Sequence, residues 1–234
     1  MSRLPFFRRL LKCFHPEGIP GLGARIYNKI SSTSLFQANY DLLTEDILDY
    51  CCQGRILDIG TGPAWLLIKL HNKSPGLSLS GIDVSSSMVV EARKNIAAVG
   101  LSQCVHIVEA DARQLPFPDG GFNAVVSTGS IHHWKDPVAA LNEVYRVLSP
   151  GGWALIYDIV ADTPSQVYAQ AERDFGRLRT MLFWLHTYEE PFYKERDFLY
   201  FANQSLFREG STRYVGALCC LTMTKGDGGK PPEN

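Results

Sequence analysis

The sequence predicts a doubly wound α/β domain built on a mainly parallel sheet of seven strands, and three features support this prediction. Between residues 55 and 160, short runs rich in β-branched residues alternate with stretches of helical periodicity. The first run ends in a glycine-rich turn at 60–62, and the last two runs, within 206–225, follow each other without a helix. Strands that alternate with helices pair in parallel between two helical layers, whereas the last two should pair antiparallel.

The expected elements follow the chain in order. Residues 1–50 form an N-terminal helical cover, in which Phe36, Tyr40 and Ile47 recur at helical spacing. The core occupies 51–160, with strands expected at 55–60, 77–84, 105–111, 122–130 and 153–160. An insertion at 161–205, rich in aromatic residues, should form helices over the domain. The last two strands fill 206–225, and 226–234 is a flexible polar tail.

Composition and charge narrow the classes of partner. The chain has 234 residues, enough for one self-sufficient hydrophobic core, and its formal net charge is −1. Because non-specific nucleic-acid binding depends on basic residues, no nucleic-acid partner is expected. None of the six cysteines forms a C-x-x-C pair, so the sequence predicts no metal site and favours a reduced, cytoplasmic protein.

Residues 1–14 combine four basic residues with several leucines and phenylalanines. The charges interrupt the apolar stretch, so the pattern is not that of a secretory signal. Two interpretations remain: an amphipathic helix that lies on a membrane surface, or a helix whose apolar stripe packs on its own domain. The second is favoured, and membrane contact through residues 1–14 is the lesser alternative.

The glycine-rich turn after the first core strand indicates a ligand site. Gly60 and Gly62 allow a sharp turn and leave bare backbone beside a ligand, and Pro63 presets φ near the start of the next helix. Ligands of such sheets bind beyond the carboxyl ends of the strands. Asp58 and Asp83 end two successive strands there. Asp58 suits a positively charged group and Asp83 suits two ribose hydroxyls, while the alternative is that both carboxylates cap helices.

A dinucleotide-binding turn is the competing interpretation of the same glycines. The G-x-G-x-x-G spacing requires glycine or alanine at position 65, where this chain has Trp65, and an indole there would crowd a pyrophosphate. Asp58, directly before the turn, suits an ammonium better than a diphosphate. The turn therefore favours a cationic amino-acid moiety.

Five motifs together carry a resemblance to a known family. LDIGTGPA, GIDVSSSMVVEAR, EADARQLPFPDGGFNAVVS, SIHHWKDP and EVYRVLSPGG occur in this order. The chain thereby resembles the class I S-adenosylmethionine-dependent methyltransferases, and most closely the methyltransferase type 11 group, which includes quinone-ring methylases. The resemblance is dense over 40–160 and loose over 24–39. It implies a Rossmann-like sheet and S-adenosylmethionine as the cofactor.

The resemblance also implies a role for each matching position. The methionine part of the cofactor would be held by Asp58, Gly60, Thr61 and Gly62 together with the backbone at Ser127; the ribose by Asp83; and the adenine by Val84, Met88, Asp111 and the amide of Ala112. For Asp111 the alternative is a loop-ordering role, and for Met88 it is the core. The chain departs from the family at Ala64, where a third glycine is frequent, and at Asn123, where aspartate is frequent.

His132 and His133 follow the fourth strand, where the resemblance places the methyl acceptor. Histidine titrates near neutral pH, so either ring is a candidate base for a hydroxyl, thiol or amine that is being methylated. The alternative is that one of them fixes the loop by hydrogen bonding. No metal takes part in this hypothesis.

The function that these observations favour is direct methyl transfer from S-adenosylmethionine to a small acceptor. The aromatic residues of the insertion favour a flat or apolar molecule. The candidates for contacting the acceptor are aromatic residues of the two helical covers: Tyr27, Phe36, Tyr40, Phe183, Trp184 and Tyr188. The alternatives are a methyltransferase acting on protein or nucleic acid and a non-catalytic binder of the cofactor. The sequence does not determine the acceptor atom or the oligomeric state.

Overall fold

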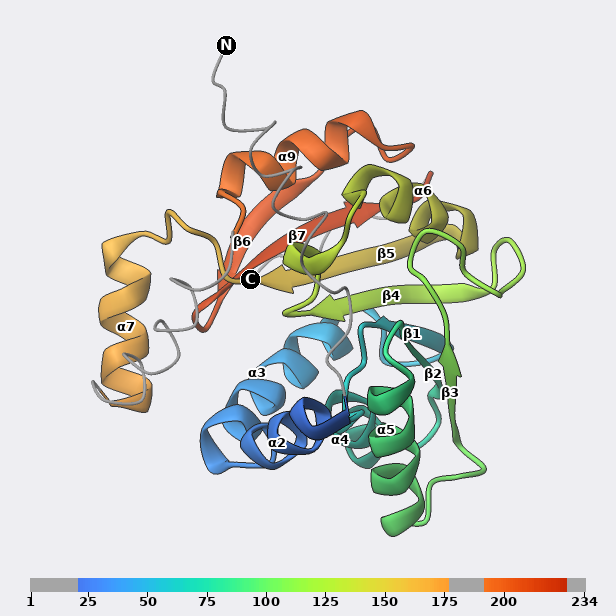
Figure 1. The fold of residues 1–234 in the computed structure, drawn as a ribbon. Helices are drawn as coiled ribbons and strands as arrows, with labels where there is room; N and C mark the ends of the chain where they lie inside the picture. The colour runs from blue at the N-terminus through green and yellow to red at the C-terminus, as the bar shows by residue number, and fades with distance from the viewer. Residues whose placement is uncertain (1–20, 177–191, 227–234) are drawn as a thin grey trace.

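The computed structural model describes residues 21–176 and 192–226, and these form one seven-stranded sheet between two layers of helices (Figure 1). The segment 1–14, the aromatics Phe183, Trp184 and Tyr188, and the tail from 227 onward lie outside the described residues. The predictions made for them therefore stay predictions.

The strand order confirms the predicted fold class. The strands are β1 Arg55–Ile59, β2 Ser78–Asp83, β3 Val105–Glu109, β4 Phe122–Thr128, β5 Leu148–Asp158, β6 Ser211–Val215 and β7 Leu218–Thr224. They lie in the order β3-β2-β1-β4-β5-β7-β6. β1 to β5 pair in parallel, and β7 pairs antiparallel with both β5 and β6. Because the strand order reverses direction between β1 and β4, the ligand crevice of such a sheet opens at their carboxyl ends.

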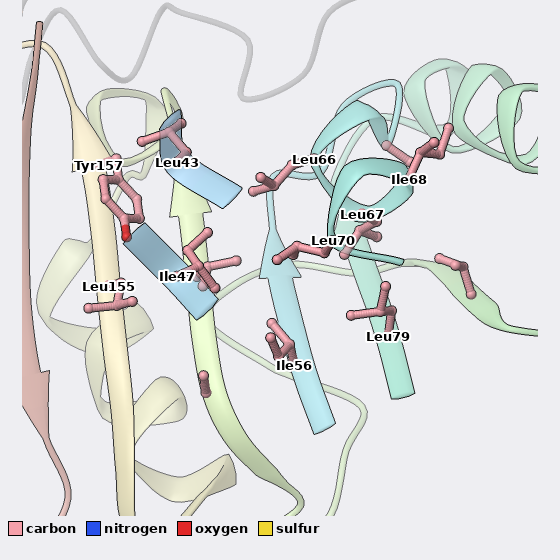
Figure 2. Packing of buried hydrophobic residues seen from close by; sticks show 14 of the residues in the cluster. Leu43, Ile47, Ile56, Leu66, Leu67, Ile68, Leu70, Leu79, Leu155 and Tyr157 are labelled. Atoms are coloured by element: carbon pink, nitrogen blue, oxygen red, sulfur yellow. The ribbon is translucent and has the colours of Figure 1, made fainter. Parts of the chain in front are cut away.

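One face of the sheet is covered by α3 Ser34–Tyr50, α4 Trp65–Lys73 and α5 Ser86–Ala98. Leu43 and Ile47, one helical turn apart on α3, are buried against Ile56 of β1 and Leu66 and Leu70 of α4 (Figure 2). Burying a side chain of this size contributes roughly 1.5–3 kcal/mol, so this contact fixes α3 on the sheet. The first helix, α2 Gly21–Ser31, lies outside this layer on α3 and α5.

The opposite face is covered by α6 Pro137–Val147 and α9 Glu195–Gln204, with a 3₁₀ turn, Ile131–His133, at the end of β4. The apolar stripe of α6 consists of Ala140, Leu141, Val144 and Val147, all fully buried. Helix α7, Ser165–Phe175, follows β5, so the segment 161–205 contains helices as predicted. None of the helices in the described ranges is long and apolar enough to cross a bilayer.

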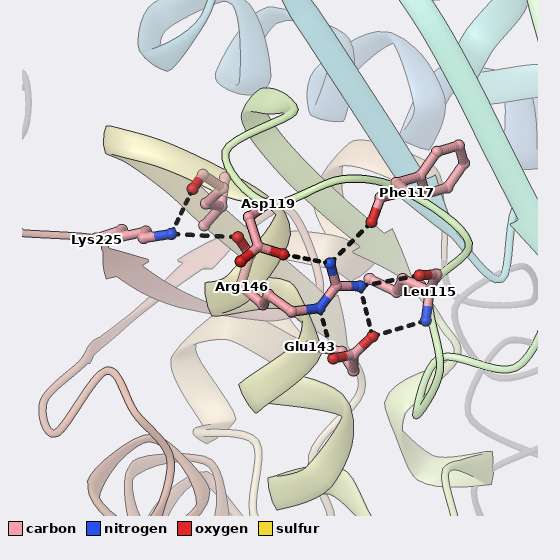
Figure 3. Close-up of polar contacts among 7 residues, drawn as sticks. Leu115, Phe117, Asp119, Glu143, Arg146 and Lys225 are labelled. Carbon is pink, nitrogen blue, oxygen red and sulfur yellow. Dashed lines mark hydrogen bonds and ion pairs between the residues drawn. The ribbon is translucent and has the colours of Figure 1, made fainter.

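A polar cluster around Arg146 secures the loop between β3 and β4 (Figure 3). Its guanidinium donates to the carbonyl oxygens of Leu115 at 2.9 Å and Phe117 at 2.8 Å. It also pairs with Glu143 and Asp119, both at 2.8 Å. Glu143 in turn accepts the Leu115 N–H at 2.8 Å, and Arg146 holds the pKa of Glu143 below its ordinary value. Each charge of this cluster has an opposite partner, as a structural cluster requires.

Candidate functional site

The turn after β1 has three residues in the left-handed region. Gly60, Gly62 and Ala64 have φ values of 71°, 50° and 64°. The Ala64 N–H donates to the Thr61 carbonyl at 2.9 Å and closes the turn, so α4 begins only at Trp65. Pro63 thus lies near the start of this helix, as expected, with Ala64 after it as a left-handed cap. This geometry also explains why a glycine suits position 64, since the left-handed conformation is unfavourable for alanine.

The two glycines of the turn are needed for different reasons. A Cβ on Gly60 would lie 2.5 Å from the Ser130 hydroxyl oxygen, so packing within the protein excludes a side chain. At Gly62 the nearest atom to an added Cβ is Tyr27 Cε1, at 3.8 Å. Space beside Gly62 is therefore open toward the site, as expected where a ligand approaches bare backbone.

Asp58 is the most unusual polar group of the site. It is 1% exposed, and its Oδ1 has no hydrogen-bond partner among the described residues; the same is true of the Thr61 hydroxyl beside it. Burial raises the pKa of Asp58 to about 7; the Thr61 hydroxyl opposes this rise and the charge of Asp83 adds to it. A buried acceptor without a donor is costly, so the arrangement suits a ligand that supplies a donor or a positive charge.

Asp83, at the end of β2, holds the turn and the next helix in register. Its Oδ2 accepts the Gly62 N–H at 3.0 Å, and its Oδ1 accepts the Ser85 N–H at 2.9 Å. Burial raises the pKa of Asp83, and these two backbone donors oppose the rise. The cap of α5 is Ser85, whose hydroxyl accepts the Met88 N–H at 3.4 Å. Asp83 is therefore not the helix cap of the alternative interpretation.

The residues expected around the adenine divide into two groups. Val84 is 39% exposed directly after β2, whereas Met88 is buried at 3% and packs in the protein interior. The carboxylate of Asp111 is held by Arg113, with Nη2–Oδ2 at 2.5 Å, and this partner lowers its pKa. Ala112 beside it is half-buried. In this structure the Asp111 carboxylate orders its own loop, as the alternative interpretation expected.

Ser127 ties the end of β4 to the end of β1. Its hydroxyl donates to the Ile59 carbonyl at 2.8 Å and lies 3.0 Å from the Ser130 hydroxyl. Ser130 in turn accepts the Trp134 indole N–H at 2.9 Å. The side chain of Ser127 is thus structural, which leaves only its backbone for the role that the resemblance implies.

His132 is joined to a carboxylate that the sequence analysis missed. Its Nδ1 lies 2.7 Å from Oδ2 of Asp158, which also accepts the His132 backbone N–H at 3.2 Å. Both side chains are buried, and the ring of His132 lies between His133, with centroids 3.9 Å apart, and Phe192, at 4.4 Å. The available signal was an acid ending the fifth strand, but the pair is 26 residues apart and meets only through the β4–β5 pairing.

Two tyrosines of the N-terminal cover complete the site. The phenol groups of Tyr40 of α3 and Tyr27 of α2 interact, and burial is the main cause of the raised pKa of both phenols. The charges of Asp83 and Asp158 also raise the pKa of Tyr27, and the charge of Asp58 raises that of Tyr40. The tyrosine pair therefore lies within electrostatic reach of both the β1–β2 acids and the His132–Asp158 pair.

A network of amides fixes α2 over this edge of the sheet. Asn28 accepts the Trp65 indole N–H at 3.1 Å and an Asn95 N–H at 3.0 Å, and it donates to Glu91 at 3.0 Å. Asn95 also donates to the Pro63 carbonyl at 2.9 Å. Trp65, where a dinucleotide turn would need a small residue, is thus a partner of the cover helix.

The part of the chain that the structure describes contains no ready-made metal site. No group of three or more histidine, cysteine, aspartate or glutamate side chains is arranged there to hold a metal ion. The arrangement instead offers buried acceptors, an open backbone turn and an oriented imidazole.

Comparison with known proteins identifies the domain. The family model described as methyltransferase domain matches residues 57–156. The demethylmenaquinone methyltransferase of Thermus thermophilus is 41% identical over 104 residues, which are 44% of this chain and 46% of that protein. The phosphatidylethanolamine N-methyltransferase of Cereibacter sphaeroides is 30% identical over 131 residues, 56% of this chain and 63% of that protein. The chain spans about half the length of the first of these relatives.

A solved structure extends the likeness over nearly the whole fold. A crystal structure titled as an S-adenosylmethionine-dependent methyltransferase from Methanococcus maripaludis superposes with a TM-score of 0.71. It covers 92% of this chain and 97% of its own, at 24% identity, and so supports the fold alone. The family model and the five ordered motifs thus agree on a methyltransferase domain over residues 57–156, and the solved structure adds support for the fold alone.

Proposed function

We propose that this chain is an enzyme that transfers a methyl group from S-adenosylmethionine to a small, flat or apolar acceptor. One observation carries the proposal: a buried, unpartnered Asp58 oxygen and an oriented His132–Asp158 pair lie at adjoining strand ends of one site. The first suits a cationic ligand and the second suits removal of a proton. The diphosphate of a dinucleotide would instead be repelled by a buried carboxylate at Asp58.

The residues present fit the proposed cofactor. Asp58 and Thr61 supply buried acceptors for an ammonium group, the open backbone at Gly62 admits the ligand, and Asp83 supplies carboxylate oxygens for hydroxyls. When bound, S-adenosylmethionine supplies an electrophilic methyl group on a positively charged sulfur. Asp111 and Met88 support the adenine role less directly, because one is paired with Arg113 and the other lies in the core.

His132 is the proposed base. A carboxylate can only accept, so at 2.7 Å Asp158 favours the tautomer with the proton on Nδ1, which makes Nε2 the basic nitrogen. That nitrogen would take the proton that a hydroxyl, thiol or amine of the acceptor loses. Tilted ring contacts with His133 and Phe192 help to hold the imidazole in place. His133 is then proposed to have a supporting part, and His132 to be the base.

The helical cover would exclude water from the reacting groups. Tyr27 and Tyr40 lie over the acids and the His132–Asp158 pair, and the Asn28 network holds α2 in place. A dry site that aligns the two reactants accelerates a direct displacement without further chemistry. The relatives' names refer to different acceptors, a quinone in one and phosphatidylethanolamine in the other, so the acceptor of this chain is proposed only as a class.

The test uses isotopically labelled S-adenosylmethionine and a small-molecule cell extract, with methylated products identified by mass spectrometry. His132→Gln and Asp158→Asn should each lower the turnover of the identified product about 100-fold or more, the usual contribution of a general base. Their affinity for S-adenosylhomocysteine should stay within about twofold, because neither variant removes a cofactor contact. The matched control is His106→Gln, at an exposed position of β3, which should behave as the native chain.

The outcomes separate the alternatives. Tight S-adenosylhomocysteine binding with no labelled small molecule would favour the non-catalytic binder. Label recovered in protein or nucleic acid would favour a macromolecular acceptor. Unchanged turnover in both site variants would remove the His132–Asp158 pair from the mechanism and leave cofactor binding intact.

A further inference from the structure

Helix α2 presents an outer face on which basic and aliphatic side chains alternate. The exposed residues of this face are Arg25, Ile26, Lys29 and Ile30. Ile26 is 53% exposed and Ile30 is 47% exposed, which is unusual for isoleucines one helical turn apart. The spacing i, i+1, i+4, i+5 places all four on one side of the helix, whereas Ala24 on the other side is fully buried.

The neighbouring helix α5 also exposes an aliphatic and a basic side chain. On α5, which contacts α2, Val90 is 49% exposed and the Lys94 side chain is 57% exposed. The one acid between the two helices, Glu91, is already occupied: it accepts from Asn28 at 3.0 Å and from Lys94 at 2.8 Å.

The two basic residues on this face of α2 form no ion pair with the described residues. Across residues 21–176 and 192–226, the structure records no ion pair for Arg25 or Lys29. Arg25 lowers the pKa of Glu91 only as its weakest influence. The face therefore carries excess positive charge, although the whole chain has a formal net charge of −1. Local positive charge on a chain without net positive charge indicates a local anionic partner.

We propose that this face of α2, with Val90 and Lys94 of α5, docks on the surface of an anionic phospholipid bilayer. Basic side chains are attracted to anionic headgroups, about fivefold in partitioning for each cation. Aliphatic side chains between them enter the boundary between headgroups and acyl chains. A nucleic acid would use the cations but not the exposed isoleucines, because its affinity rests on phosphate contacts.

The orientation of α2 places this face on one side of the helix and the site on the other. Tyr27, on the inner side of the same helix, feels the charges of Asp83 and Asp158. Helix α2 thus separates the docked surface from the site by one helix diameter, about 10 Å. An acceptor dissolved in the bilayer would reach the site along the edge of α2, whereas a water-soluble acceptor would gain nothing from docking.

The experiment is co-sedimentation of the full chain with vesicles of phosphatidylcholine alone and of phosphatidylcholine mixed with phosphatidylserine. Binding should require phosphatidylserine and weaken with added salt. Arg25→Gln with Lys29→Gln should weaken partitioning about 30-fold, and Ile26→Ser with Ile30→Ser about tenfold. The matched controls are Arg173→Gln with Arg196→Gln, and Val99→Ser with Leu206→Ser, all at exposed positions elsewhere. Both controls should stay within about twofold of the native chain.

Four results would overturn the docking proposal. These are no binding to either vesicle, equal binding with and without phosphatidylserine, loss of binding only on Arg8→Glu with Arg9→Glu, and binding of RNA in place of vesicles. Calorimetry with S-adenosylhomocysteine, run on every variant, checks the fold. Retained cofactor affinity in a variant that no longer sediments separates a failure of docking from a failure of the proposed enzyme function.

Discussion

Two polar clusters of this molecule show opposite electrostatic designs. Around Arg146, opposite charges meet at 2.8 Å, and the pKa of Glu143 is lowered because its charged form is favoured. Around Asp58, like charges gather, Oδ1 lacks a donor among the described residues, and burial raises the pKa to about 7. The first arrangement stabilises the fold by itself. The second is incomplete without a ligand, which is why it marks the site.

The largest difference between the clusters should appear in stability. Arg146→Leu leaves the carbonyls of Leu115 and Phe117 and the carboxylate of Glu143 without their donor. Because the arginine side chain is 30% exposed, water replaces part of what is lost, and we expect a decrease of about 2–3 kcal/mol in the free energy of unfolding. Urea denaturation measures it, with Arg173→Leu, an exposed arginine, as the control.

Cofactor affinity of the Arg146→Leu variant should stay within about twofold, since no side chain of the cluster is a candidate cofactor contact. If affinity fell in parallel with stability, the two clusters would not be separate in function.

Asp83→Ala should have the opposite effect to Arg146→Leu, with the change in cofactor affinity and not mainly in stability. Removing this carboxylate leaves ligand hydroxyls without acceptors and frees the Gly62 N–H, so affinity for S-adenosylhomocysteine should fall by roughly 1–3 kcal/mol. Isothermal calorimetry on the folded variant measures this loss. Asp119→Ala, which removes an exposed acid of the Arg146 cluster, is the control and should bind as the native chain does. Unchanged affinity in Asp83→Ala would place Asp83 outside the site.

The smallest expected effect is a pH dependence that belongs to Asp58. If the ligand needs the ionised carboxylate, a pKa of about 7 in the free protein makes S-adenosylhomocysteine bind about tenfold more weakly at pH 6 than at pH 8. Asp58→Asn should abolish this slope while lowering the affinity at pH 8. A native chain whose affinity does not change with pH would contradict the assignment.

In the free protein, the raised pKa of Asp58 also makes the free energy of unfolding depend on pH. The folded-state pKa lies above the unfolded value of 3.8, so the folded state binds the additional proton between those two values. The contribution of Asp58 to stability is therefore greatest at acid pH and is lost as the pH rises toward about 7 and beyond. Asp58→Asn should remove this trend from urea denaturation curves.

The sequence predicted the fold well because its signals are local. Each core strand ends in an acidic residue or is followed directly by a glycine, and the apolar spacing of α6 and α3 directly gives their buried faces. The parallel pairing of the core strands and the antiparallel pairing of the last two followed from the presence or absence of an intervening helix. The left-handed conformation of Ala64 was not predicted, because alanine rarely adopts it.

The sequence analysis named candidate site residues that belong to motifs, and it missed the contacts that form only in the tertiary structure. Asp58, Gly60, Thr61 and Gly62 lie in one motif, but Asp158 meets His132 through strand pairing, and the Tyr27–Tyr40 hydrogen bond depends on the packing of two helices. The Asn28–Glu91–Asn95–Trp65 network is equally long-range. Such contacts require the tertiary structure, because no local periodicity encodes them.

Calorimetry of the native chain with S-adenosylhomocysteine tests the central claim most directly. An incomplete acidic site with an open glycine turn should bind this ligand with a dissociation constant in the micromolar range, on the order of −7 to −9 kcal/mol at pH 8. NAD, titrated in parallel, should bind far more weakly because Trp65 lies where a dinucleotide turn needs a small residue. Saturation only at millimolar S-adenosylhomocysteine, or tighter binding of NAD, would contradict this account of the site.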